Sequence, residues 1–170
     1  MLFENIFYSR IINFLIVFFF LLFFQSLISD WITIQGARLD LGIFILVYLA
    51  LNHSATEAVI FGFIWGVLVD VLNPSLLGLG TLIKVILGFA LANFKSQLYF
   101  ETSLPRALII FGAVVFNELS YNLVALNANF TSWANIFFRF TLPTALYTSL
   151  VGSLFWLWRN KTNLVKAGVK

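Results

Sequence analysis

The sequence predicts an all-α, polytopic membrane protein with six transmembrane helices. Hydrophobic residues make up 61% of the 170 residues and charged residues only 10%, whereas soluble domains average roughly 45–50% and about 25%. A soluble domain of this size could not cover 21 Phe side chains with so few charged ones. Apolar runs of about 20 residues, long enough to cross a bilayer as helices, recur along the chain.

Six such runs are predicted to span the membrane, and they leave no room for a soluble domain. The second run is short, and it reaches full length only by extending back through Arg38 and Asp40. We still count it, because 39–51 is too apolar to lie in water. No small-x-small cleavage site follows the first run, so we interpret it as an uncleaved anchor. The predicted spans are about 11–28, 39–52, 56–72, 76–94, 104–126 and 136–158.

Lys and Arg near the span ends predict the orientation, because they accumulate on the cytoplasmic side. With six spans and a cytoplasmic N-terminus, Arg38 and Arg139 lie outside. With five spans, Arg10 and Arg38 exchange sides and the balance is unchanged. Both topologies place the C-terminus in the cytoplasm, and we favour the six-span one. The residues on the cytoplasmic side are then Arg10, Lys95, Arg106, Arg159, Lys161, Lys166 and Lys170.

Composition and motifs predict no enzyme, cofactor or metal site. The chain has no Cys and one His, which excludes disulfides and thiolate metal sites. We find no metalloprotease, phosphate-loop or nucleophile-elbow motif. The net charge of +3 indicates membrane orientation rather than nucleic-acid binding. We expect the basic C-terminal tail to contact anionic lipid.

Small residues form two stripes at helical spacing. Ala58, Gly62, Gly66 and Asp70 recur every four residues and therefore share one helix face. Such stripes let another backbone come close in a membrane. The stripe ends at a carboxylate, and Pro74 then breaks the helix. The next predicted span carries a matching stripe, which consists of Gly80, Lys84, Gly88 and Ala92.

Lys84 falls within the fourth predicted span, where an unpartnered charge is costly. Two partners are in reach: Asp70 across the turn, and Glu118 at a similar depth in the fifth span, with Asn122 close by. We favour an internal ion pair that fixes helix packing. A polar core that binds a ligand or a partner, and a proton or ion relay, are alternatives. In the sixth span, Pro143 predicts a kink.

One stretch carries a family resemblance. It reads GFIWGVLVDVL at 62–72, then Pro74, then LGLGTL at 77–82. This resembles the G-F-x-x-G-x-x-x-D … P-x-x-x-G-x-x-x-L signature of the MreD family of rod shape-determining membrane proteins. The likeness extends in a general way from about Arg10 to Trp158.

The resemblance implies a six-helix fold similar to the S components of energy-coupling-factor transporters. It also implies a non-enzymatic scaffold of the elongation machinery in the bacterial inner membrane. Such a scaffold would bind MreC and act indirectly with MreB, RodA and a class B penicillin-binding protein in controlling peptidoglycan synthesis. The residues that would then shape a helix-packing or partner-docking surface are Gly62, Gly66, Asp70, Pro74, Gly78 and Gly80.

A different class of protein stays open as the alternative. A true S component would capture a vitamin in a cavity lined by Trp65, Lys84, Glu118 and Asn122. Those proteins typically carry an Ala-x-x-x-Ala motif in the first helix, whereas the first run here is filled with Phe and Leu. A subunit of an unrelated transporter is a third interpretation.

Overall fold

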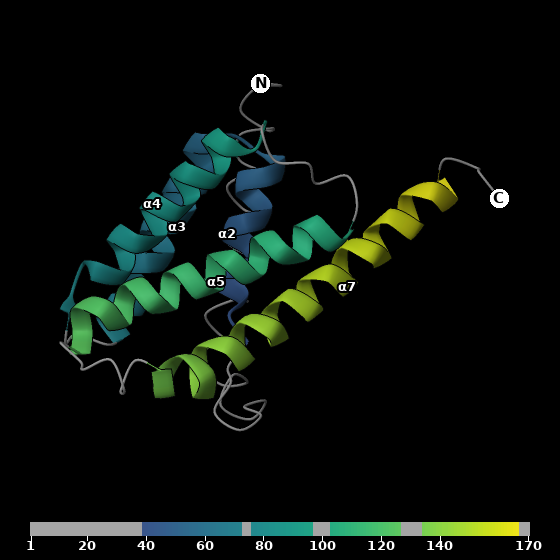
Figure 1. Ribbon diagram of the computed structural model, residues 1–170. Helices are drawn as coiled ribbons and strands as arrows, with labels where there is room; N and C mark the ends of the chain where they lie inside the picture. The colour runs from purple at the N-terminus through teal and green to yellow at the C-terminus, as the bar shows by residue number, and fades with distance from the viewer. Residues whose placement is uncertain (1–38, 73–75, 97–102, 127–133, 167–170) are drawn as a thin grey trace, which may run out of the picture.

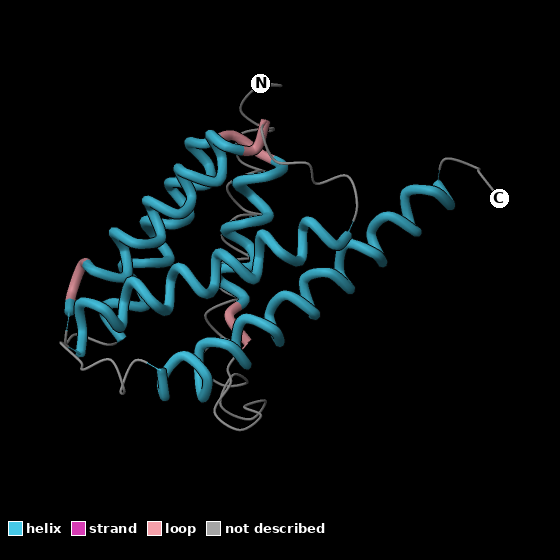
Figure 2. The backbone as a smooth tube through the Cα atoms, viewed as in Figure 1, coloured by secondary structure: helices cyan, strands magenta, loops and turns pink. Residues whose placement is uncertain are grey.

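The computed structural model describes residues 39–72, 76–96, 103–126 and 134–166, with side chains up to Leu157. Every regular element within these residues is a helix (Figures 1 and 2), so the all-α prediction is confirmed. The predicted span 11–28 lies outside the described residues. The elements are α2 (Leu41–Asn52), α3 (Ala55–Leu72), α4 (Leu79–Phe94), α5 (Ser103–Leu126), the π-helix η3 (Phe137–Thr141) and α7 (Leu142–Lys166).

Three of the helical segments are long and apolar enough to cross a bilayer: Ala55–Leu72, Leu104–Ala125 and Ala134–Leu157. The apolar helices α2 and α4 are shorter, with 12 and 16 residues. At 1.5 Å per residue they measure about 18 and 24 Å, less than the roughly 30 Å hydrocarbon core. That these two helices also span, and that there are six spans in all, stays a prediction.

Helix α2 lies at the centre of the described bundle and contacts α3, α4, α5 and α7. Its side chains Ile43, Leu46, Val47 and Ala50 are fully buried. Burying such side chains against protein rather than lipid gains no hydrophobic transfer energy, because lipid tails are equally apolar. The bundle therefore depends on close packing and on polar contacts between helices.

Helices α3 and α4 form a closely packed antiparallel hairpin (Figure 1). A Cβ atom added at Gly62 would lie 2.9 Å from the Lys84 carbonyl oxygen, and one at Gly88 would lie 3.1 Å from the Ala58 carbonyl oxygen. At Gly66 it would collide with the Cα atom of Thr81. The backbones of the two helices are therefore in contact, and a side chain in place of any of these three glycines would force the helices apart.

Polar contacts connect the two helices at the open end of the hairpin, where α3 begins and α4 ends. Ser54 Oγ accepts a hydrogen bond from the Glu57 backbone N–H (3.3 Å), as an N-cap side chain does, and its hydroxyl donates to Glu57 Oε1 (3.2 Å). His53 Nδ1 lies 2.8 Å from Glu57 Oε2. Lys95, just after α4, donates to the His53 carbonyl oxygen at 2.7 Å. These bonds hold the end of α2, the start of α3 and the end of α4 together.

Helices α5 and α7 form a second pair (Figure 1). The Arg106 guanidinium near the start of α5 lies 5.2 Å from the centroid of the Trp156 ring on α7. Gly152 lies close to α5, because a Cβ atom there would lie 2.5 Å from Ile110 Cδ1 and the Ile110 side chain would have to shift. The N-terminal part of α5 therefore packs against the C-terminal part of α7, so the pair is antiparallel.

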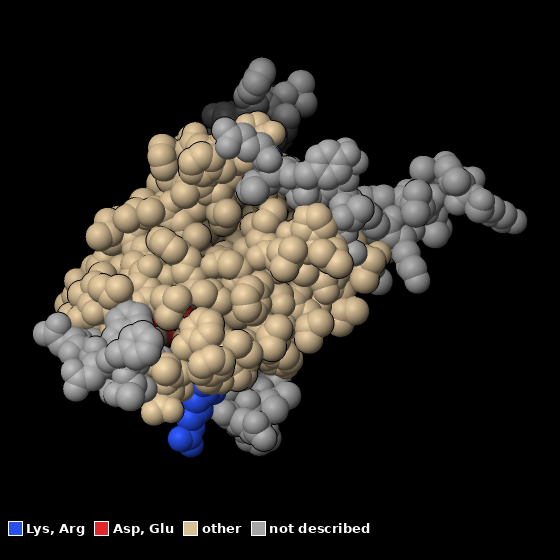
Figure 3. Space-filling view, in the orientation of Figure 1, with Lys and Arg blue, Asp and Glu red and all other residues tan. Residues whose placement is uncertain are grey.

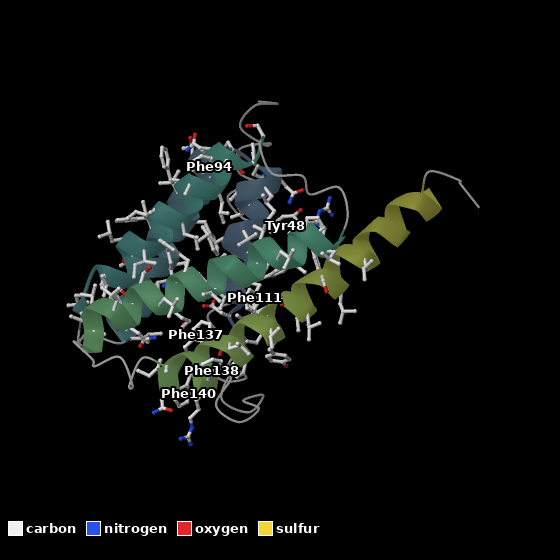
Figure 4. All side chains as sticks on the ribbon, viewed as in Figure 1. Tyr48, Phe94, Phe111, Phe137, Phe138 and Phe140 are labelled. Carbon is white, nitrogen blue, oxygen red and sulfur yellow. The ribbon has the colours of Figure 1, made fainter. Side chains whose placement is uncertain are left out.

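The predicted disturbance at Pro143 takes the form of a widened turn. The Leu142 N–H donates to the Phe137 carbonyl oxygen, five residues back rather than four. Proline lacks an N–H, and its ring clashes with the carbonyl group four residues earlier, which a π turn relieves. Phe137, Phe138 and Phe140 belong to this turn (Figure 4), and the last two are exposed.

Substituting Gly66 with Ala should destabilise the protein by about 1–3 kcal/mol, because the added methyl group overpacks the α3–α4 contact. The matched control is Gly112→Ala on α5, where nothing lies within 4 Å of the added Cβ. The control should be neutral or stabilising by up to ~1 kcal/mol. Unfolding in detergent, followed by tryptophan fluorescence, measures both. Equal effects for the two variants would contradict the packing argument.

Candidate functional site

Asp70 on α3 caps the N-terminus of α4. Its Oδ2 accepts hydrogen bonds from the Gly78 N–H (3.0 Å), the Thr81 N–H (2.9 Å) and the Thr81 hydroxyl (2.7 Å). The N-cap residue itself, Gly78, has no side chain to supply this acceptor. Backbone N–H groups at a helix start have no intrahelical partner, and in a bilayer no water replaces it. Asp70 therefore satisfies donors that would otherwise oppose the burial of this turn.

Two glycines make this cap feasible, for different reasons. Gly78 has φ +93°, a left-handed conformation that residues with a Cβ rarely adopt. At Gly80 the limit is space, since a Cβ atom would collide with Asp70 Oδ1 and lie 3.4 Å from Lys84 Nζ. Pro74, predicted to belong to the same turn, lies outside the described residues.

Lys84 is 5% exposed and lies in an electrostatic cluster with two half-buried carboxyl groups. Its charge acts on the carboxyl groups of Asp40 and Glu118, and the charge of Asp40 also acts on Glu118. Within the described part of the chain, its hydrogen bond is a long one of 3.5 Å to the Gly80 carbonyl oxygen, and no carboxylate there forms an ion pair with it. The cluster thus brings together charges from α4, α5 and the start of α2.

Asp40 belongs to this cluster although it was predicted only as part of a span. It is the N-cap of α2, and its Oδ1 accepts from the Ile43 N–H at 2.9 Å. Its own N–H donates to Thr148 Oγ1 on α7 at 3.2 Å. An Asp directly before an apolar helical run is a typical N-cap signal, which could have identified this residue from the sequence. Asp40 therefore connects α2 to α7 and to the charge of Lys84.

Other polar residues of α5, η3 and α7 are also buried or half-buried, among them the predicted Asn122. Asn117 is 6% exposed and its Oδ1 has no hydrogen-bond partner; the same holds for Thr141 Oγ1 on η3. Asn122 bonds within its own helix, donating to the Glu118 carbonyl oxygen at 2.8 Å. Thr144 and Thr148 on α7 are also buried. Several helices therefore contribute polar groups to the interior.

Trp65, expected to line a vitamin cavity if the protein were an S component, packs tightly in the hydrophobic core. It is 1% exposed, and its indole ring occupies the space that a side chain at Gly42 would need. It also stacks on Phe61, with ring centroids 6.3 Å apart. The glycine on α2 and the tryptophan on α3 thus form a close contact between these helices.

The outer surface of the described bundle is strongly apolar. Large hydrophobic side chains are exposed on α3, α4, α5 and α7, whereas those of α2 are buried or half-buried. The face seen in Figure 3 is almost free of charged side chains. Within the described residues, no group of three His, Cys, Asp or Glu side chains could hold a metal ion. The charges in the interior therefore contrast with a surface suited to lipid and to other membrane helices.

These features define a helical membrane protein in which the described polar side chains cap helix ends or interact with one another inside the bundle. Residues 8–162 match the family model of the rod shape-determining protein MreD. The chain belongs to the MreD family, and the resemblance inferred from the sequence is confirmed. No curated protein and no solved structure matches it. Membership indicates a role in determining rod shape, in a family of structural membrane proteins not known as enzymes.

Substituting Asp70 with Ala should destabilise the protein by about 1–2 kcal/mol, the usual cost of removing an N-cap. The Asp70→Asn variant keeps an acceptor oxygen and should lose much less. Hydrogen exchange measured by mass spectrometry should show faster exchange of the peptide that contains Gly78 and Thr81 in the Ala variant alone. Unchanged exchange there would contradict the capping role.

A double-mutant cycle tests the electrostatic cluster. We expect Lys84→Met and Glu118→Gln to be non-additive by at least about 0.5 kcal/mol, because the charge of one stabilises the other in a medium of low dielectric constant. A cycle between Lys84→Met and Asp40→Asn should behave in the same way. Unfolding in detergent supplies the free energies. Additivity in both cycles would show that Lys84 is not held by these carboxyl groups.

Proposed function

We propose that this protein is a non-enzymatic membrane scaffold of the cell-elongation machinery. It binds the transmembrane helix of MreC and so helps to control rod shape and lateral peptidoglycan synthesis. Its effects on MreB, RodA and a class B penicillin-binding protein are indirect, through MreC. The family supports the role in rod shape. The observation that carries the scaffold is the exposure of large apolar side chains on α3, α4, α5 and α7.

The proposed location is the bacterial inner membrane, with six spans, the S-component-like arrangement and both termini in the cytoplasm. The contacts at the helix ends support this topology. The Lys95–His53 bond places the end of α2, the start of α3 and the end of α4 at one edge. The start of α5 packs near Trp156 of α7. Within each of the pairs α3–α4 and α5–α7 the two helices therefore run in opposite directions, which is compatible with consecutive spans.

The residues of the predicted site have supporting roles in this proposal. Gly62, Gly66, Gly78 and Gly80, with Asp70, hold α3 against α4 and so shape the outer surface of the hairpin that a partner meets. Pro74 is assigned to the same turn from the sequence alone. Lys84 and Glu118, with Asn122 beside them, fix the packing of α4 against α5. In this proposal the scaffold presents rigid apolar faces to its partner, and its charged residues hold the helices together in the interior.

The proposal predicts that the full chain and MreC co-purify from detergent-solubilised membranes. A tagged single-pass membrane protein of unrelated sequence is the control and should not be retained. The chain should also restore rod shape to cells depleted of their own MreD, scored by the ratio of cell length to width. Failure in both assays, with the protein present in the membrane at normal level, would refute the scaffold.

A further inference from the structure

An apolar groove of about 400 Å³ runs along the outer surface between α3 and α4. Phe63, Val67 and Val71 follow one another at every fourth residue of α3 and form one wall. Leu77, before α4, and Leu82 and Val85 on α4 line the other. From Phe63 to Val71 the groove extends over about 12 Å of helix. A groove with side chains at this spacing fits the ridge of another helix.

Asp70 is the charged residue among the described residues that line this groove. Its Oδ2 receives three hydrogen bonds, but no described residue donates to Oδ1, and no described cation forms an ion pair with it. The dipole of α4 balances part of the charge. Asp70 lies two residues before the end of α3, about 3 Å from the end of the helix. Oδ1 of Asp70, a residue that is 4% exposed, therefore keeps an acceptor position without a described donor at the end of an apolar groove, with the Lys84 ammonium group nearby but beyond ion-pair distance.

We propose that the α3–α4 groove seats the transmembrane helix of the partner, and that this helix carries a basic side chain level with Asp70. The inference rests on the proposed function, to which it adds a docking surface and the chemistry of recognition. The apolar walls match the apolar face of a spanning helix. Asp70 supplies the complementary charge, which favours a helix with Lys or Arg at the corresponding end over a uniformly apolar one.

The absence of Cys from the chain allows a direct test by single-cysteine cross-linking. Val67→Cys and Leu82→Cys place a thiol in the groove. The matched controls are Leu108→Cys on α5 and Leu154→Cys on α7, both about as exposed as Leu82, at 61%, 63% and 56%. Each variant is co-expressed with MreC carrying one Cys scanned along its transmembrane helix. We expect oxidised adducts with MreC from the groove positions and none from the controls.

Two substitutions test the recognition chemistry. Leu82→Trp fills the groove and Asp70→Asn removes the charge while keeping an acceptor for the cap. Each should reduce co-purified MreC at least tenfold, whereas Leu108→Trp should leave it unchanged. Replacing the basic residue at the matching end of the MreC helix by Gln should have the same effect as Asp70→Asn. Unfolding measurements show whether each variant is folded. If Leu82→Trp does not fold, the cysteine cross-linking still tests the groove.

The outcomes separate this inference from the function on which it rests. MreC that binds all variants equally, or that cross-links to the control positions, overturns the groove and leaves the scaffold intact. Groove cysteines that link two copies of this chain, or that form no protein adduct because lipid fills the groove, also overturn it. If MreC fails to bind the unsubstituted protein, the proposed function itself fails.

Discussion

The first amide groups of a helix need acceptors, and inside a bilayer no water supplies them. At the start of α4 the carboxylate of Asp70 meets this need from the neighbouring helix. It can reach those amides only because α3 and α4 are in backbone contact at Gly62 and Gly66. The backbone contact between α3 and α4, the left-handed conformation of Gly78 and the space at Gly80 therefore all contribute to the cap that Asp70 forms on α4. Loss of any one of them would leave either a buried donor without a partner or a helix pair that cannot close.

The same requirement explains the polar interior. Lys84 lies six residues after the N-cap Gly78 on α4, and its charge acts on the carboxyl groups of Asp40 and Glu118 on other elements. Charges inside a membrane protein interact strongly because the surroundings have a low dielectric constant. Asp40 also caps α2 and bonds to Thr148 of α7. Polar contacts and charges thus connect α2, α4, α5 and α7, whereas apolar packing alone would not favour contact with protein over contact with lipid.

Spacing along the sequence was enough to identify the two small-residue stripes, since four-residue periodicity is preserved in any helix. It also singled out Asp70 and Lys84, because charges within apolar runs are conspicuous. The acceptor role of Asp70 was not predictable, since it depends on the turn geometry of Gly78 and on how the hairpin closes. Asp40 was missed because it was taken as part of a span. Helix α2 is apolar around its whole circumference, so periodicity could not reveal that it is the central helix.

The π turn at Phe137–Thr141 contains one residue more than an α turn. Side chains before and after it are consequently out of phase with a single helical repeat. Phe138 within the turn is exposed while Thr144 and Thr148 after it face the interior, although no continuous α-helical stripe joins them. The helical segments before and after the turn can therefore face different environments. Deletion of one residue within the turn would rotate these two segments relative to each other by about 100°.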